Sequence, residues 1–214
     1  MQPSDKHDPK LQLMSTKDWE YLKERSKYHF RSDVVDPKFD TVTKVGKIPV
    51  TWTQEDLDFL EVNSQRLMGA EQEKDYDLEN KGFIAGHVKI NVSQQLPKSL
   101  REVEKAFCLE DGWSKIVIQK PGQLWPLHMD LLERFCPEDP SRVVRYVIHL
   151  TSWKPGQFWA YGNYQYAHWK AGDVTTFNWQ DLPHCTANAG YHTRMTLQIT
   201  GLRTDRSEDY INWL

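Results

Sequence analysis

The sequence predicts a mainly β (α+β) fold, with a jelly-roll core and supporting helices in the N-terminal half. Two observations predict it. From residue 113 onward, short β-rich runs alternate with turns, a spacing typical of sandwiches and barrels. Before that point, apolar residues recur with helical spacing. Nine Trp, nine Tyr and eight Phe among 214 residues supply the large side chains that such a core needs.

The N-terminal part is expected to hold helices and one strand. A polar start at 1–14 is typical of a loose tail. Apolar spacing predicts helices at 16–27, 53–69 and 99–107, with a strand at 83–91 and a loop or short edge strand at 32–50. Thr53 is suited to cap the second helix, because acidic residues follow it in the first turn.

The remaining part is expected to consist of strands. These are predicted at 114–120, 142–151, 157–161, 164–169, 173–179 and 193–202. Pro-Gly pairs at 121–122 and 155–156 mark turns between them. The expected organisation is a supporting region at 1–112 packed on a core at 113–205, followed by a C-terminal tail at 206–214.

Charge and cysteine content exclude some classes of function. A net charge of −3 without long charged runs makes nucleic acid an improbable partner, because duplex binders usually present a basic face. No apolar run could span a bilayer and no signal peptide begins the chain, so no membrane association is expected. Three cysteines without CxxC spacing favour a reduced, cytoplasmic setting.

His128 and Asp130 form the most informative pair. In an extended strand they point to the same side, so both can present ligand atoms to one metal ion. A third ligand must come from elsewhere, and two histidines with one carboxylate suit Fe(II) with open positions. The alternative is a surface histidine near a solvated aspartate, since such pairs also arise by chance.

Two later histidines, His168 and His184, are candidates for the third ligand. Beyond them, alternation along 194–200 places Arg194, Thr196, Gln198 and Thr200 on one face of a strand. A polar face headed by an arginine predicts an anion site, because the guanidinium binds carboxylates with two parallel hydrogen bonds. An edge strand with a solvated polar face is the alternative.

His128-x-Asp130, His184 and Arg194, in this order, resemble the Fe(II)/2-oxoglutarate-dependent oxygenases, whose fold is a double-stranded β-helix. The resemblance covers about 114–203 and is nearest to the prolyl 4-hydroxylase branch. Further matching segments are Lys-Pro-Gly at 120–122, Tyr-Val-Ile-His-Leu-Thr at 146–151, Pro-Gly-Gln-Phe-Trp at 155–159, Asp-Val-Thr-Thr-Phe-Asn-Trp at 173–179 and Pro-His at 183–184.

The resemblance implies roles for individual residues. His128, Asp130 and His184 would ligate iron, while Arg194 and Thr196 would bind the distal carboxylate of 2-oxoglutarate. The branch has a tyrosine where this chain has His149, so His149 is assigned to the same carboxylate. The other expected contacts are Tyr146 (in reserve) and Lys120 for the cosubstrate, and Trp125, Trp159 and Gln198 for the substrate.

The implied activity is hydroxylation dependent on Fe(II), 2-oxoglutarate and O₂, with ascorbate as a possible reductant. The substrate would be a peptide or protein side chain, an amino acid or a small metabolite. A cupin-like isomerase or a non-catalytic metal-binding jelly roll is the alternative, although cupins usually carry His-x-His. Repair demethylases fit less well, because Arg203 lies too far from Arg194. The aromatic residues of 158–169 could line a substrate cleft or pack between sheets.

Overall fold

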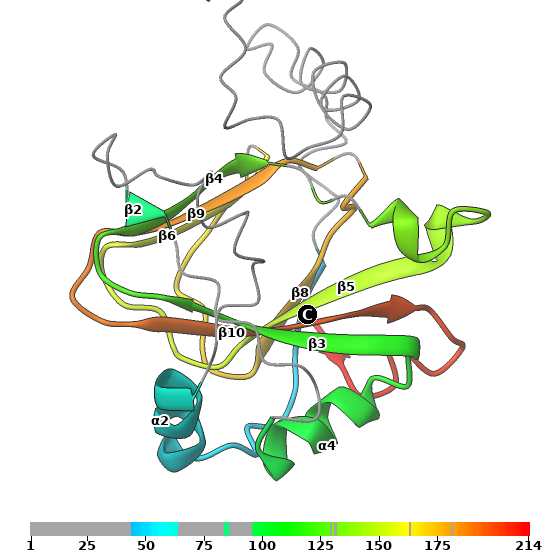
Figure 1. The fold of residues 1–214 in the computed structure, drawn as a ribbon, viewed down its shortest axis with the longest axis horizontal. Coiled ribbons are helices and arrows are strands. Elements are labelled where there is room, and N and C mark those ends of the chain that lie inside the picture. Colours follow the sequence, from blue (N-terminus) through cyan, green and yellow to red (C-terminus); the bar gives the residue numbers. More distant parts are fainter. Residues whose placement is uncertain are drawn as a thin grey trace, which may run out of the picture.

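Two β-sheets face each other, and helices cover the outer side of one of them. The computed structural model describes residues 44–63, 84–85, 96–128, 130, 132–162, 164–180 and 182–214, with backbone only at 84–85 and 126–128. Helices α2 (Gln54–Asn63) and α4 (Lys98–Ala106) lie below the six-stranded sheet, on the side away from the second sheet (Figure 1).

The six-stranded sheet has the order β11-β1-β8-β5-β10-β3 and is antiparallel throughout. Its strands are β1 (Lys44–Lys47), β3 (Glu110–Gln119), β5 (Val143–His149), β8 (Asp173–Thr176), β10 (Arg194–Leu202) and β11 (Asn212–Trp213). β10 lies between β5 and β3, with Thr196 opposite His149 on one side and Val117 on the other. This register places side chains from three strands on each face in defined rows.

The second sheet has the order β2-β4-β9-β6-β7. Its strands are β2 (Ile84–Ala85), β4 (Gln123–His128), β6 (Gln157–Tyr161), β7 (Tyr164–Tyr166) and β9 (His184–Asn188). The pairing of β4 with β9 is irregular between Trp125 and His128, and His128 then lies opposite His184. Two facing, mostly antiparallel sheets confirm the predicted mainly β, jelly-roll fold and are consistent with a double-stranded β-helix.

Alternation along the strands divides the apolar residues into two clusters. Outward-facing Ile116, Ile148 and Leu197 pack with Leu60 and Leu100 of the helices. Inward-facing residues form the second cluster between the sheets, which includes Val147, Trp159, Tyr161, Tyr166, Trp169, Phe177 and Trp179. Because β5 is buried along its whole length, both of its faces are part of a packed layer.

The helices were predicted with partial success. The predicted helix at 99–107 is confirmed as α4, and the described part of the helix predicted at 53–69 is α2. Thr53 caps α2, since its backbone N–H donates to Asp56 Oδ2 at 2.8 Å and its Oγ1 accepts from the Asp56 N–H. The tail expected at 1–14, the helix expected at 16–27 and most of the strand expected at 83–91 lie outside the described residues.

Two segments expected to be peripheral belong to the six-stranded sheet. Within 32–50, the described residues 44–50 contain β1 at their start, which pairs with β8 and β11 and is therefore not an edge strand. The segment expected to be a C-terminal tail contains β11, and Ile211 before it is buried in the helix-side core. Two short 3₁₀ turns, η5 (Glu133–Phe135) and η6 (Pro140–Arg142), connect β4 to β5. Separate strands corresponding to β4 and β9 were not predicted.

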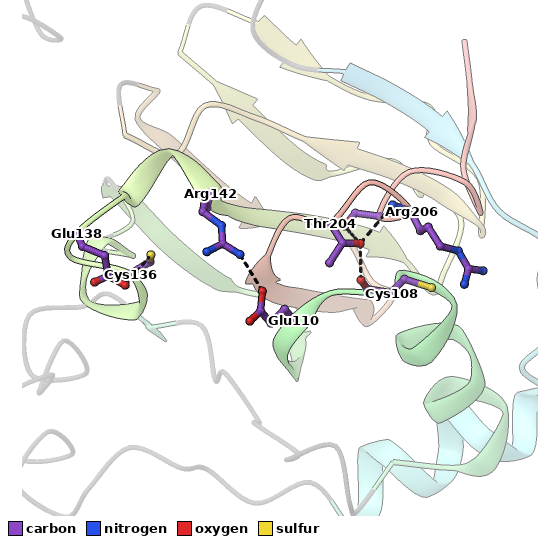
Figure 2. A network of polar contacts seen from close by, with 8 residues as sticks. Cys108, Glu110, Cys136, Glu138, Arg142, Thr204 and Arg206 are labelled. Carbon is purple, nitrogen blue, oxygen red and sulfur yellow. Dashed lines mark hydrogen bonds and ion pairs between the residues drawn. The ribbon is translucent and has the colours of Figure 1, made fainter.

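Polar contacts tie the ends of β3, β5 and β10 together (Figure 2). Arg142 Nη2 donates to Glu110 Oε2 at 2.7 Å, and Thr204 Oγ1 donates to the Cys108 carbonyl at 2.8 Å. The first pair is exposed and contributes little to stability. No helix within the described ranges is long and apolar enough to cross a membrane.

One turn depends on glycine. Gly156, in the turn before β6, has a φ of +89°, and a Cβ there would lie 2.5 Å from the Gly190 nitrogen. The Gly156 carbonyl accepts a hydrogen bond from the Ala189 N–H at 2.8 Å. The turn before β6 and the turn after β9, which lie at the same end of this antiparallel pair, therefore approach closely, and only glycine fits.

Candidate active site

Asp130 and His184 lie together between the sheets. Asp130 Oδ2 is 3.8 Å from His184 Nε2, and both residues are buried. A metal ion bound at about 2.1 Å from each atom would span this gap. The backbone of His128 pairs with that of His184 across β4 and β9, which brings all three expected ligand positions to one end of this strand pair.

Asp130 and His184 are the two expected ligands whose side chains the structure describes. The described side chains contain no group of three His, Cys, Asp or Glu residues that could hold a metal ion. The His128 side chain lies outside the described set, so the structure supplies its backbone position alone. His168, the alternative third ligand, is exposed and packs 4.4 Å from the Trp153 ring, away from Asp130. The donors that are described, one imidazole and one carboxylate, fit Fe(II).

Arg145 holds the Asp130 carboxylate. Its Nη1 donates to Asp130 Oδ2 at 2.6 Å, and its Nε donates to Thr200 Oγ1 at 2.9 Å. All three residues are buried, so the ion pair offsets the cost of removing both charges from water. Arg145 is not among the site residues predicted from the sequence. Its signal was the two-residue spacing that puts Arg145, Val147 and His149 on the same face of β5.

Arg194 is a buried cation at the start of β10. Its side chain is 1% exposed, and its Nη1 has no hydrogen-bond partner among the described residues. Its guanidinium carbon lies 4.5 Å from the centre of the Trp159 ring. Burial lowers the pKa of Arg194 to about 9. A buried guanidinium of this kind is expected to bind an anion, because an anion would supply the missing hydrogen-bond acceptors.

Thr196 and His149 lie beside Arg194 on the same inner face. They are opposite each other across β10 and β5, and both are fully buried. Thr196 Oγ1 and both ring nitrogens of His149 have no partner among the described residues. Three neighbouring side chains thus present unused polar atoms, which is unusual in a core because each such group carries a desolvation cost.

Aromatic rings enclose His149. Its ring centre lies 4.6 Å from that of Trp169 in a stacked arrangement, 5.2 Å from Trp159 and 5.4 Å from Tyr166. Burial, followed by the positive charge of Arg194, holds the pKa of His149 well below its ordinary value. His149 is therefore neutral near pH 7, and one of its nitrogens can donate a hydrogen bond to an anion.

Tyr161 links the Arg194 site to the Asp130–His184 pair. Its hydroxyl is 2.7 Å from Thr175 Oγ1, and burial raises its pKa strongly. Its ring centre lies 5.7 Å from that of Trp159, which the Arg194 guanidinium contacts, and 6.2 Å from that of His184. The cation site at Arg194 and the ligand pair at Asp130 therefore belong to one interior.

The structure separates two of the expected cosubstrate contacts from this interior. Tyr146 lies on the helix side of β5, 4.9 Å from the ring of Phe107, and cannot reach Arg194 through the sheet. Lys120 is exposed at the end of β3, with its Nζ 3.8 Å from Glu61 Oε1. Tyr146 and His149 are three residues apart on β5, so they lie on opposite faces of the strand. Lys120 lies past the last residue of β3.

The expected substrate contacts occupy different places. Trp125 is partly buried opposite Thr186, whereas Trp159 lies under Arg194. Gln198 is partly buried on the inner face of β10, and its Oε1 has no partner among the described residues. Most rings of 158–169 are buried against one another, so packing between the sheets is their principal role.

No protein-family model matches the sequence, and no curated protein does either. Similar solved structures exist. A prolyl 4-hydroxylase from Pseudomonas putida has 16% identity and a TM-score of 0.47, covering 78% of this chain and 96% of its own. The viral collagen prolyl hydroxylase from Paramecium bursaria Chlorella virus-1, in complex with 2-oxoglutarate, has 15% identity and a TM-score of 0.42, covering 74% and 96%. The non-heme α-ketoglutarate-dependent carbocyclase SnoK from nogalamycin biosynthesis has 16% identity and a TM-score of 0.41, covering 70% and 83%.

Proposed function

We propose that this chain is an Fe(II)- and 2-oxoglutarate-dependent oxygenase that hydroxylates a small molecule or an amino-acid side chain. The observation that carries the proposal is Arg194, a fully buried cation with an unused N–H, which ring contacts through Trp159 and Tyr161 connect to His184 and Asp130. A dicarboxylate whose one end reaches a metal ion and whose other end reaches Arg194 would satisfy both features.

The residues divide the work as follows. His128, Asp130 and His184 would hold Fe(II), and Arg145 keeps the Asp130 carboxylate in place through its 2.6 Å hydrogen bond. Arg194, Thr196 and neutral His149 would each donate a hydrogen bond to the distal carboxylate of 2-oxoglutarate. Iron bound by these residues would supply oxidation of a substrate C–H bond with O₂, coupled to decarboxylation of 2-oxoglutarate to succinate and CO₂.

Burial contributes to specificity for the cosubstrate. Arg194, Thr196 and His149 are at most 1% exposed, so water cannot replace a lost carboxylate contact. A monocarboxylate of similar shape would leave the guanidinium buried without an acceptor, and such mispairing typically costs about 1–3 kcal/mol. We therefore expect 2-oxoglutarate to bind much better than its analogue 2-oxobutyrate.

The decisive experiment is anaerobic titration of the Fe(II)-loaded protein with 2-oxoglutarate. Binding should produce a metal-to-ligand absorption band, and 2-oxobutyrate should give a far weaker response at equal concentration. Addition of O₂ and ascorbate should then release succinate, even slowly without substrate. Zn(II) in place of Fe(II) should abolish succinate release, because zinc does not change oxidation state.

Variants test which residues are responsible for metal binding and turnover. His128→Ala should lower metal content and abolish turnover, whereas Lys98→Met, an exposed change on α4, should behave as the wild type. If the protein binds metal but neither binds nor consumes 2-oxoglutarate, the oxygenase proposal fails. The chain would then be a metal-binding jelly roll without this activity.

A further inference from the structure

Lys115 is a partly buried cation that the proposed function does not use. It lies on β3, opposite Gln198 of β10. Its neighbour Ile116 packs in the helix-side core, so alternation directs Lys115 to the space between the sheets. No hydrogen bond or ion pair joins its Nζ to another described residue.

The charges around Lys115 are mostly positive. Burial, then the charge of Arg145, lowers the pKa of Lys115 to about 7, and Arg134 acts in the same direction. Asp130 is the one group that raises this pKa, and Arg145 already holds its carboxylate at 2.6 Å. Positive charge near Lys115 therefore exceeds the negative charge available to it.

The cosubstrate does not correct this imbalance. In the proposed function, one carboxylate of 2-oxoglutarate is taken by the metal and the other by Arg194. Because Fe(II) adds two positive charges and 2-oxoglutarate removes two, the region around Lys115 keeps its excess. A further anionic group beside Lys115 would reduce this excess and would favour its protonated form.

A pair of aromatic rings lies at the Trp113 end of the same face of β3. Trp113, two residues earlier on the same face of β3, has its ring centre 5.6 Å from that of Phe135 in η5. The Arg134 guanidinium lies 5.2 Å from the Phe135 ring, and Phe135 is partly exposed. Trp113 Nε1 and Gln198 Oε1 are buried without partners among the described residues. This corner thus combines an apolar surface with unused polar atoms.

Resting on the proposed function, we propose that the substrate to be oxidised is an organic acid whose carboxylate pairs with Lys115. Its apolar part would lie against Trp113 and Phe135, and Gln198 would contact a polar group nearby. Lys115 thereby selects a charged substrate over a neutral one of the same shape, because only the charged substrate gives its ammonium an ionic partner.

The test uses two probes that differ only in charge, phenylacetate and phenylacetamide. Protein loaded with Zn(II) and saturating 2-oxoglutarate is titrated with each by calorimetry, so that Arg194 is already occupied. The wild type should bind phenylacetate at least tenfold more tightly than phenylacetamide. Lys115→Met should remove this preference, Lys115→Arg should retain it, and Lys98→Met should match the wild type.

Equal affinities of the wild type for the two probes would overturn the proposal, as would an unchanged preference in Lys115→Met. If Lys115→Met does not fold, the comparison in the wild type and in Lys115→Arg still decides. Binding of 2-oxoglutarate is measured in the same samples. If it binds and the probes are not distinguished, only the organic-acid inference fails. If it does not bind, the oxygenase proposal fails, and the titrations of wild type and Lys115→Met without cosubstrate test Lys115 alone.

Discussion

Replacing Arg194 with methionine should stabilise the protein while destroying its response to 2-oxoglutarate. The two effects have one cause. Arg194 is fully buried, and no carboxylate of the described residues pairs with it. Without an anion its charge is a cost to the fold, and with a carboxylate it becomes a binding interaction.

The size of the effect follows from the structure. Burial lowers the pKa of Arg194 from 12.5 to about 9, and a tenfold change in proton affinity is about 1.4 kcal/mol, so the buried charge is disfavoured by roughly 5 kcal/mol. The contact with Trp159 at 4.5 Å returns at most about 2 kcal/mol. Imperfect packing of methionine costs about 1 kcal/mol more. A net gain of about 2 kcal/mol remains, which in a protein of this size raises Tm by roughly 4–8 °C.

Thermal unfolding of the Zn(II)-loaded protein, with and without 2-oxoglutarate, measures both parts. The wild type should be stabilised by about 2.7 kcal/mol at a cosubstrate concentration of 100 times Kd, and Arg194→Met should show no such shift. Arg101→Met, an exposed change on α4, is the control and should leave both values unchanged. A variant that is less stable than the wild type and still responds to 2-oxoglutarate would refute the reasoning.

Three further predictions concern stability. His149 is neutral in the native state because burial and Arg194 depress its pKa, whereas the same residue in the unfolded chain binds a proton below about pH 6.5. Tm should therefore fall as the pH drops below that value. A fall of equal slope in His149→Phe would contradict the assignment. Arg145→Met should destabilise the metal-free protein by about 3–5 kcal/mol, because Asp130 is left buried without its cation. Urea unfolding should show a smaller loss of stability with Zn(II) bound. An equal loss with and without Zn(II) would argue against Asp130 as a ligand. Gly156→Ala should cost at least about 2 kcal/mol in urea unfolding, since its φ of +89° disfavours any Cβ, and a near-neutral effect would mean that this turn can rearrange.

The inner face of β10 could be predicted from the sequence because its polar residues recur with the two-residue period of a strand. Arg194, Thr196 and Gln198 occupy every second position of β10. If one of them faces the interior between the sheets, all three do. The same logic applied to β5 identifies His149 and excludes Tyr146, three residues away. That exclusion was available from the pattern alone.

The rest depended on contacts between distant segments. Arg145 looks like an ordinary charged residue in an apolar strand until Asp130, fifteen residues earlier, is brought to 2.6 Å from it. Lys115 gives no local signal either, because its surroundings are set by β10 and η5. β11 was missed because a two-residue strand has almost no periodicity, and its pairing with β1 spans most of the chain.

The alternation of β10 also limits how this protein can evolve. Its two faces serve separate purposes, since Leu197 and Ile199 pack under the helices while Thr196 and Gln198 line the interior. Point substitutions at Gln198 can therefore retune selectivity while the hydrophobic packing persists. Loss of codon 195 or 196 would instead exchange the two faces over the rest of the strand, sending leucine into the polar interior and glutamine into the core. New specificities in this scaffold should accordingly arise by substitution in β10, with changes of length confined to the connecting turns.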